Sequence, residues 1–200
     1  MATKFSFKWL AKRIGIFAAL ALLAFGVYWL YLLATDNLHP VIAGQIYRSG
    51  QMNGDHLARI IQEYGIKSVL NLRGENLTTR WHQAEMATTA KLNVTHYDRS
   101  LGSGTELTLA QLDDLVTLLR QAPKPILIHC NGGADRSGLV SAIYCYAIDG
   151  EPAEKADQQL TIWYGHIPLI RPRVIAMDNF FWRYVTNHEQ QIKLQTNSAP

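Results

Sequence analysis

Hydrophobic and polar residues follow the periods of strands and helices along most of the chain. Short apolar or alternating runs predict strands at residues 41–47, 66–72, 93–97 and 126–129. Helical spacing predicts helices at residues 55–64, 79–92, 109–121, 139–148, 152–164 and 173–188. Because helices separate the strands, we predict an α/β fold with a central, mostly parallel sheet flanked by helices on both faces.

One segment departs from this alternation, because residues 14–33 (IGIFAALALLAFGVYWLYLL) carry no charge. A helix of this length spans about 30 Å, the thickness of the hydrocarbon core of a bilayer. A cleaved signal peptide and a buried core helix are the alternatives. The apolar part of a signal peptide is usually only about 7–15 residues long, and a core helix would have a polar face. We therefore predict a basic tail at residues 1–13, a transmembrane anchor at 14–34, one folded domain at 35–190 and a C-terminal tail at 191–200.

The basic residues at the N-terminus change the meaning of the net charge of +3. Lys4, Lys8, Lys12 and Arg13 precede the apolar segment, and no acidic residue comes before Asp36. Of the 19 basic residues, these four leave 15 against 16 acidic residues in the rest of the chain, which argues against nucleic acid as a partner. Positive charge on this side of a span predicts a cytoplasmic N-terminus, and in a bacterium a periplasmic domain.

The candidate chemistry lies where the strand predicted at residues 126–129 ends. Residues 129–138 read HCNGGADRSG, a strand end, a glycine-bearing loop and the start of a helix. Such a short loop can turn successive backbone N–H groups inward as an anion-binding nest. Arg136 can bind two oxygens of one phosphate, and the same positive field favours the thiolate of Cys130. The thiolate can then attack phosphorus and form a phosphocysteine, which is hydrolysed in a second step.

This stretch resembles the signature of the cysteine-dependent phosphatases, in which His-Cys is followed by five residues and Arg-Ser/Thr. The segments GQIYRSGQ and IKSVLNLRGE are also similar to those of bacterial dual-specificity-type members. The resemblance implies that Cys130 is the nucleophile, that Arg136 binds the phosphate and the transition state, and that Ser137 assists the thiolate as leaving group. It implies that His129 holds the loop, and that backbone amides bind the phosphate oxygens without a metal or other cofactor. The residues of this phosphate loop are Asn131, Gly132, Gly133, Ala134 and Asp135.

Family members place an aspartic acid on a mobile loop about thirty residues before the nucleophile, where it protonates the leaving group. Asp98 lies 32 residues before Cys130, after a predicted strand and at the head of a glycine-containing loop. We therefore predict Asp98 as the general acid, with Asp135 and Glu106 as alternatives. The sequence departs from the family here, because it has no Trp-Pro-Asp and no proline anchors the loop.

The substrate is less closely defined by the sequence. The phosphate loop contains Asp135 and no Lys, Arg or His, which disfavours densely charged inositol phosphates. We predict a membrane-anchored phosphatase for phosphate monoesters on protein Tyr, Ser or Thr, with a lipid or envelope phosphate as the alternative substrate. A sulfurtransferase and a non-catalytic phosphate-binding module are the alternatives from other classes.

Several further residues receive expectations of their own. Arg48 and Ser49, at an early strand end, are expected to support the site, and Cys145 is expected to be an inert buried thiol. His166 is expected to serve packing. The candidates for the rim of the site are Arg80, Trp81, His82, Arg171 and Arg173.

Overall fold

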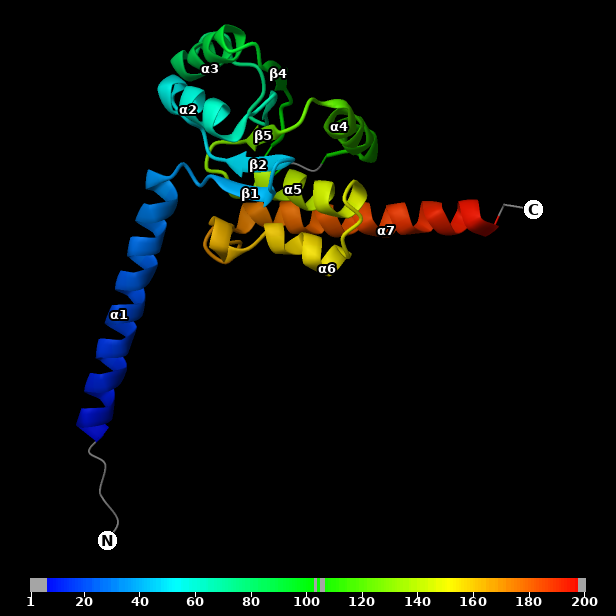
Figure 1. Ribbon diagram of the computed structural model, residues 1–200. Coiled ribbons are helices and arrows are strands. Elements are labelled where there is room, and N and C mark those ends of the chain that lie inside the picture. Colours follow the sequence, from blue (N-terminus) through cyan, green and yellow to red (C-terminus); the bar gives the residue numbers. More distant parts are fainter. Residues whose placement is uncertain (1–6, 103, 105–106, 198–200) are drawn as a thin grey trace. The chain divides into compact units, whose positions relative to one another are not determined.

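The computed structural model describes residues 7–102, 104 and 107–197. The chain forms two compact units, with the boundary between residues 35 and 36 of the sequence. The first contains helix α1 (Phe7–Ala34), drawn in blue in Figure 1. Within it, Trp9–Ala34 is the one helix in the described part of the chain that is long and apolar enough to cross a membrane, a property that signal sequences share.

The second unit is built on a five-stranded sheet with the order β1-β2-β5-β3-β4. Its strands are β1 (His39–Ile42), β2 (Ile46–Ser49), β3 (Ser68–Asn71), β4 (Thr95–Asp98) and β5 (Ile126–His129). All neighbours pair in parallel except β1 and β2. The register aligns the last residues of the four parallel strands in one row at the carboxyl edge of the sheet: Ser49, His129, Asn71 and Asp98.

Helices cover both faces of this sheet (Figure 1), which confirms the predicted α/β fold. One face is covered by α2 (Gly54–Tyr64) and α3 (Arg80–Lys91). The other face is covered by α4 (Leu109–Gln121), α5 (Arg136–Ala147), α6 (Ala153–Ala156) and α7 (Ile175–Asn197). Three short 3-10 turns lie between α6 and α7, namely η1 (Asp157–Gln159), η2 (Ile162–Tyr164) and η3 (Pro172–Val174).

The alternation of side chains along β5 decides which residues face which helices. Ile126 and Ile128 belong to the apolar cluster on the α5 face, whereas Leu127 belongs to the cluster on the α2 face. Because successive side chains of a strand point to opposite faces, His129 turns toward α2 and α3 while Cys130 turns toward α5. The side chains of these two adjacent residues therefore lie on opposite faces of the sheet.

Three predicted elements differ from the structure. The strand predicted at residues 41–47 is two antiparallel strands, because Gly44 takes a left-handed φ of 76° and reverses the chain. The helix predicted at 152–164 is broken into α6, η1 and η2, since Leu160 leaves the helical region with φ −109° and ψ 65°. The last helix begins at Ile175 and continues past residue 188 to Asn197.

Candidate active site

Cys130 follows directly after β5, and its thiol lies against the first turn of α5. Its side chain is only 3% exposed, and its Sγ lies 3.5 Å from the Oγ of Ser137. The phosphate loop, residues 131–135, connects the strand to the helix. The structure thus brings Cys130 and Ser137 together at a helix N-terminus, where the helix dipole favours an anion.

The carbonyl groups of the phosphate loop are bound by the scaffold around it. The carbonyl of Asn131 accepts a hydrogen bond from the backbone N–H of Gln51 at 3.1 Å. The carbonyl of Gly132 accepts one from Nδ2 of Asn37 at 2.9 Å. These two bonds fix the first half of the loop with its oxygens outward.

Arg48 binds the carbonyl groups in the second half of the phosphate loop, so these also point outward. Its Nη2 donates to the carbonyls of Gly133 at 2.9 Å and Ala134 at 2.8 Å. In a trans peptide the N–H points away from the C=O of the same unit, so four bound carbonyls turn the four following N–H groups to the opposite side. This is the arrangement of an anion-binding nest.

The guanidinium of Arg48 is fully buried, and its two Nη atoms donate to four oxygens, while its Nε has no partner among the described residues. Its Nη1 donates to the backbone O of Gln159 at 2.6 Å and to the Oε1 of the same residue at 3.1 Å. Its carbon Cζ lies 4.3 Å from the centre of the Tyr164 ring. Burial lowers the pKa of Arg48 to about 10, while Tyr164 and Cys130 act in the opposite direction, so the group stays charged at neutral pH. Arg48 supports the loop, as its place at a strand end predicts.

At Gly133 the phosphate loop lies directly against the backbone at the end of β2. Its φ of 70° is left-handed, and a Cβ there would lie 2.6 Å from the backbone N of Gly50 and 2.7 Å from the backbone C of Ser49. No side chain fits such a contact without moving the backbone. This glycine therefore allows the loop to dock onto the end of β2.

Asp135 is held by two cationic side chains from outside the loop. Its carboxylate accepts hydrogen bonds from Arg171 at 2.9 and 3.2 Å and from Nδ1 of His166 at 2.8 Å. The other ring nitrogen of His166 donates to Asp178 at 2.9 Å. Burial opposes the charged imidazolium, but the hydrogen bonds to the two aspartates outweigh it and raise the pKa of His166 to about 9.

This network changes two expectations from the sequence. His166 is a buried, charged partner of the phosphate loop and does more than pack. The negative charge of Asp135 is compensated by Arg171 and His166, so the loop itself offers less repulsion to a polyanion than its composition suggests.

Arg136 begins α5 and reaches across the carboxyl edge of the sheet. Its Nη1 donates to the carbonyls of Leu72 at 3.3 Å and Leu101 at 3.2 Å. These contacts place its guanidinium beside the end of β3 and the loop after β4. A planar cation in this position can bind two oxygens of a phosphate seated over the loop.

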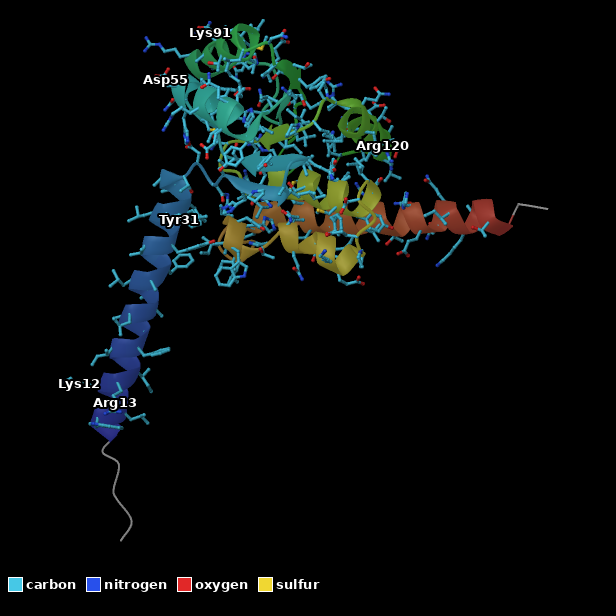
Figure 2. The ribbon with its side chains drawn as sticks, in the orientation of Figure 1. Lys12, Arg13, Tyr31, Asp55, Lys91 and Arg120 are labelled. Carbon is cyan, nitrogen blue, oxygen red and sulfur yellow. The ribbon has the colours of Figure 1, made fainter. Side chains whose placement is uncertain are left out.

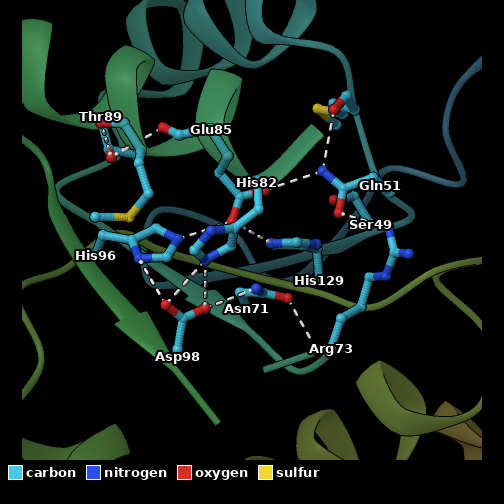
Figure 3. A network of polar contacts seen from close by, with 12 residues as sticks. Ser49, Gln51, Asn71, Arg73, His82, Glu85, Thr89, His96, Asp98 and His129 are labelled. Atoms are coloured by element: carbon cyan, nitrogen blue, oxygen red, sulfur yellow. Dashed lines mark hydrogen bonds and ion pairs between the residues drawn. The ribbon is translucent and has the colours of Figure 1, made fainter. Parts of the chain in front are cut away.

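His129 faces the opposite side of the sheet, where it contacts Glu85 of α3 (Figure 3). Its Nε2 lies 3.0 Å from Oε1 of Glu85, and the same oxygen lies 2.7 Å from Nε2 of His96. Nε2 of Gln51 donates to the other oxygen at 2.9 Å. Burial alone would favour a neutral Glu85, but the hydrogen bonds from His129 and His96 outweigh it and hold the pKa of this carboxyl well below its usual range.

Asp98 ends β4, and its register partner Asn71 places it on the α3 face with His129. Its carboxylate accepts a hydrogen bond from Nδ2 of Asn71 at 2.7 Å and lies 3.1 Å from Nε2 of His82. Among the described residues its side chain contacts Asn71, His82 and His96, and it makes no hydrogen bond to Cys130 or Arg136. Glu106, the alternative acid, lies outside the described residues.

The remaining candidates take up supporting positions. Both cysteines are free, and burial raises the pKa of the Cys145 thiol to about 12, as expected of an inert residue. Of the rim candidates, Trp81 lies beneath the guanidinium of Arg73 at 3.8 Å, whereas His82 is buried.

Three residues of this site have no signal in the sequence. Asn37 and Glu85 lie far from the signature, and nothing in their local sequence marks them as partners of it. His166 follows the signature by some thirty residues, and the two aspartates that charge it come from different elements. Only the fold brings these side chains to the loop.

Comparison with known proteins agrees with this geometry. Residues 40–174 match the family described as PTP-SAK, the Swiss Army Knife protein DSP-PTPase phosphatase domain. No curated protein matches the chain.

Solved structures with the same fold include TpbA, PTPMT1 and SIW14. P. aeruginosa TpbA, in complex with phosphotyrosine, is 19% identical, with 73% of this chain and 83% of that chain covered and a TM-score of 0.54. PTPMT1 in complex with PI(5)P is 18% identical, with 76% and 99% covered and a TM-score of 0.52. The core catalytic domain of the PP-IP phosphatase SIW14 from S. cerevisiae is 20% identical, with 82% and 94% covered and a TM-score of 0.60.

Proposed function

The chain belongs to the family of Swiss Army Knife DSP-PTPase phosphatase domains, and we propose that it hydrolyses phosphate monoesters on protein side chains through a phosphocysteine intermediate. The observation that carries this proposal is the phosphate loop itself. Its four carbonyls are bound outward by Gln51, Asn37 and Arg48, so its N–H groups face the space beside Cys130. Such a preorganised set of donors stabilises the charge of a phosphoryl group in transfer.

The two chemical steps follow from the positions of three side chains. The thiolate of Cys130 attacks phosphorus, the bond from phosphorus to the ester oxygen breaks, and that oxygen leaves with a proton. Water then attacks the phosphocysteine, the P–S bond breaks and phosphate is released. Ser137, 3.5 Å from the sulfur, can donate a hydrogen bond to the departing thiolate, and Arg136 binds the phosphoryl oxygens in both steps.

Asp98 is the proposed donor of the proton to the leaving group. It lies at the carboxyl edge from which the phosphate loop rises, and its side chain is 22% exposed. Proton donation requires this carboxylate to leave Asn71 and His82. Asp135 is a poorer candidate, because both its oxygens already bind Arg171.

A membrane-anchored form of this enzyme is part of the proposal. Figure 2 shows Lys12 and Arg13 toward the N-terminal end of α1 and Tyr31 toward its other end. This order of charged and aromatic residues fits a span whose N-terminus stays in the cytoplasm and whose catalytic domain, in a bacterium, faces the periplasm.

A lipid phosphate is the second candidate substrate, and one observation favours it. Leu169 (93% exposed) and Ile170 (67% exposed) lie close in sequence to Arg171, a combination that suits a lipid interface.

Phosphate release by the full chain in detergent tests the proposal, with p-nitrophenyl phosphate as substrate. We expect Cys130→Ser to abolish turnover, whereas Cys145→Ala, which removes the other buried thiol, retains it. Phosphate binding without release from any ester would support a binding module, and turnover of thiosulfate would support a sulfurtransferase. A phosphotyrosine peptide and a lipid phosphate in mixed micelles, assayed side by side, decide between the two substrate classes.

A further inference from the structure

We propose that His82, His96 and Asp98 form a binding site for a divalent transition-metal ion such as Zn²⁺. The three side chains converge at the edge strand β4, on the α3 face of the sheet (Figure 3). His82 comes from α3, while His96 and Asp98 are two residues apart on β4 and so point to the same side. The site lies outside the phosphate loop but shares Asp98 with the proposed hydrolysis, which does not need the ion.

Two separations between the ligand atoms lie on either side of the value for a tetrahedral zinc site. Nε2 of His82 lies 3.1 Å from Oδ2 of Asp98, and Nδ1 of His96 lies 3.7 Å from the same oxygen. All three ligand atoms lie within 4.8 Å of one another. Bonds of about 2.0–2.1 Å at tetrahedral angles separate neighbouring ligand atoms by roughly 3.3 Å. The two measured separations lie on either side of this value, and the histidine nitrogens, which lie within 4.8 Å of each other, would approach to bind one ion.

The hydrogen bonding of His96 is the strongest argument for a cation. Its Nε2 lies 2.7 Å from Oε1 of Glu85, a carboxylate that also accepts from His129 and Gln51 and has no proton to give. Nε2 of His96 therefore carries the proton, and in the neutral ring Nδ1 presents a lone pair toward Asp98. Two acceptors then face one another across 3.7 Å, which is too long for a hydrogen bond and close to the spacing of two metal ligands.

The charges around the site also favour a cation. The carboxylates of Asp98 and Glu85 lie among histidine side chains. No Lys or Arg of the described chain forms a salt bridge with either carboxylate within 4.0 Å. Glu85 would orient His96 from behind, as carboxylates do for metal-bound histidines. Histidine and carboxylate together suit Zn²⁺ and neighbouring transition metals better than Ca²⁺ or Mg²⁺.

Three protein ligands leave a fourth position open, and the partly exposed Asp98 gives the ion a way in. Coordination by Nε2 moves the proton of His82 to Nδ1, which is buried and has no hydrogen-bond partner among the described residues. Because a buried N–H of His82 would be left without a partner and only three protein ligands bind the ion, we expect a dissociation constant on the order of micromolar. Such binding is weaker than that of a closed site with four protein ligands. While the ion is bound, Asp98 cannot donate a proton.

The test is titration of Zn²⁺ into the full chain in detergent, by calorimetry, in the Cys130→Ser background so that the catalytic thiolate cannot bind the metal. We expect one Zn²⁺ per chain and at least a tenfold loss of affinity in His82→Gln and in His96→Gln. His56→Gln is the matched control, because it removes the histidine of another His–Asp pair, with Asp36. That variant should bind Zn²⁺ like its parent.

A second measurement covers variants that fold poorly. In the parent protein, Co²⁺ should give the visible absorption of tetrahedral nitrogen and oxygen coordination, and Zn²⁺ should raise the melting temperature while a chelator reverses the rise. The absence of stoichiometric binding at about 100 μM Zn²⁺, or unchanged binding in both histidine variants, would overturn the proposal. Since these readouts need no turnover, they are independent of the proposed phosphatase activity.

Discussion

The two sides of the carboxyl edge of the sheet are assembled in different ways. On the α5 side, Cys130, the phosphate loop, Arg136 and Ser137 come from one continuous stretch of chain. On the α3 side, the cluster around Glu85 combines α3, β4 and the end of β5. In the first, the sequence itself places the chemical groups together and distant residues only support the loop, whereas the second depends on the register of three strands. We expect the first to control the reaction and the second to control the stability and the ion content of the edge.

The largest effect expected on the α5 side comes from Arg136→Lys. Lysine keeps the charge but lacks the planar fork that binds two phosphate oxygens, so kcat should fall about 10³-fold, or about 4 kcal/mol in the barrier. Steady-state hydrolysis of p-nitrophenyl phosphate measures the effect. The matched control is Arg59→Lys at an exposed position of α2, which should leave kcat unchanged. A loss in Arg136→Lys of less than tenfold would refute the assignment of Arg136.

The pair of Asp135 and His166 gives the α5 side a pH-dependent stability. The folded state raises the pKa of His166 from 6.5 to about 9, so the folded state binds more protons than the unfolded state between these values. The contribution of His166 to the free energy of unfolding is therefore complete below pH 6.5 and is lost as the pH rises through about 9. It totals about 3 kcal/mol. Urea unfolding at pH 6, 7.5 and 9 measures this slope. In His166→Gln the slope over this window should be smaller, and an equal slope would contradict the assignment.

The contrast between the two sides also explains what could be predicted from the sequence. The signature loop was recognisable because its nucleophile, its glycines and its arginine lie within eight residues, between an apolar strand and a helix. The helices at residues 55–64 and 109–121 and the strand at 126–129 are confirmed because each has a clear period and a stop signal, such as the left-handed Gly65.

Elements set by distant contacts were not predictable in the same way. Residues 152–164 have helical spacing, yet the helix breaks at Leu160, where the backbone O of Gln159 accepts from the buried Arg48. The face of the sheet on which Asp98 lies depends on the pairing of Asp98 with Asn71 across β3 and β4. It depends in turn on the pairing of Asn71 with His129 across β3 and β5. A single sequence carries the alternation within a strand but not the register between strands.

Asp98→Asn tests whether the two sides cooperate in one reaction. If Asp98 supplies the proton, kcat should fall about 10²-fold with an alkyl phosphate and much less with p-nitrophenyl phosphate, whose leaving group needs little protonation. Both substrates are assayed with the metal removed by chelation, and Asp114→Asn on the exposed face of α4 is the control. Equal losses with the two substrates would separate Asp98 from proton transfer and leave Glu106 as the candidate.

The smallest effect on turnover is expected from Glu85→Gln, which alters the α3 side alone. Glu85 accepts hydrogen bonds from His129, His96 and Gln51, and a glutamine presents an NH₂ group where one of these donors now points. The conflict should lower the free energy of unfolding by about 1–3 kcal/mol. Because His129 and Glu85 lie on the face of the sheet opposite to Cys130, kcat should fall less than tenfold. Glu63→Gln, on the exposed face of α2, is the control for the loss of one carboxylate. A fall in kcat as large as that of Arg136→Lys would show that the α3 side takes part in the chemistry, and the distinction drawn between the two sides would fail.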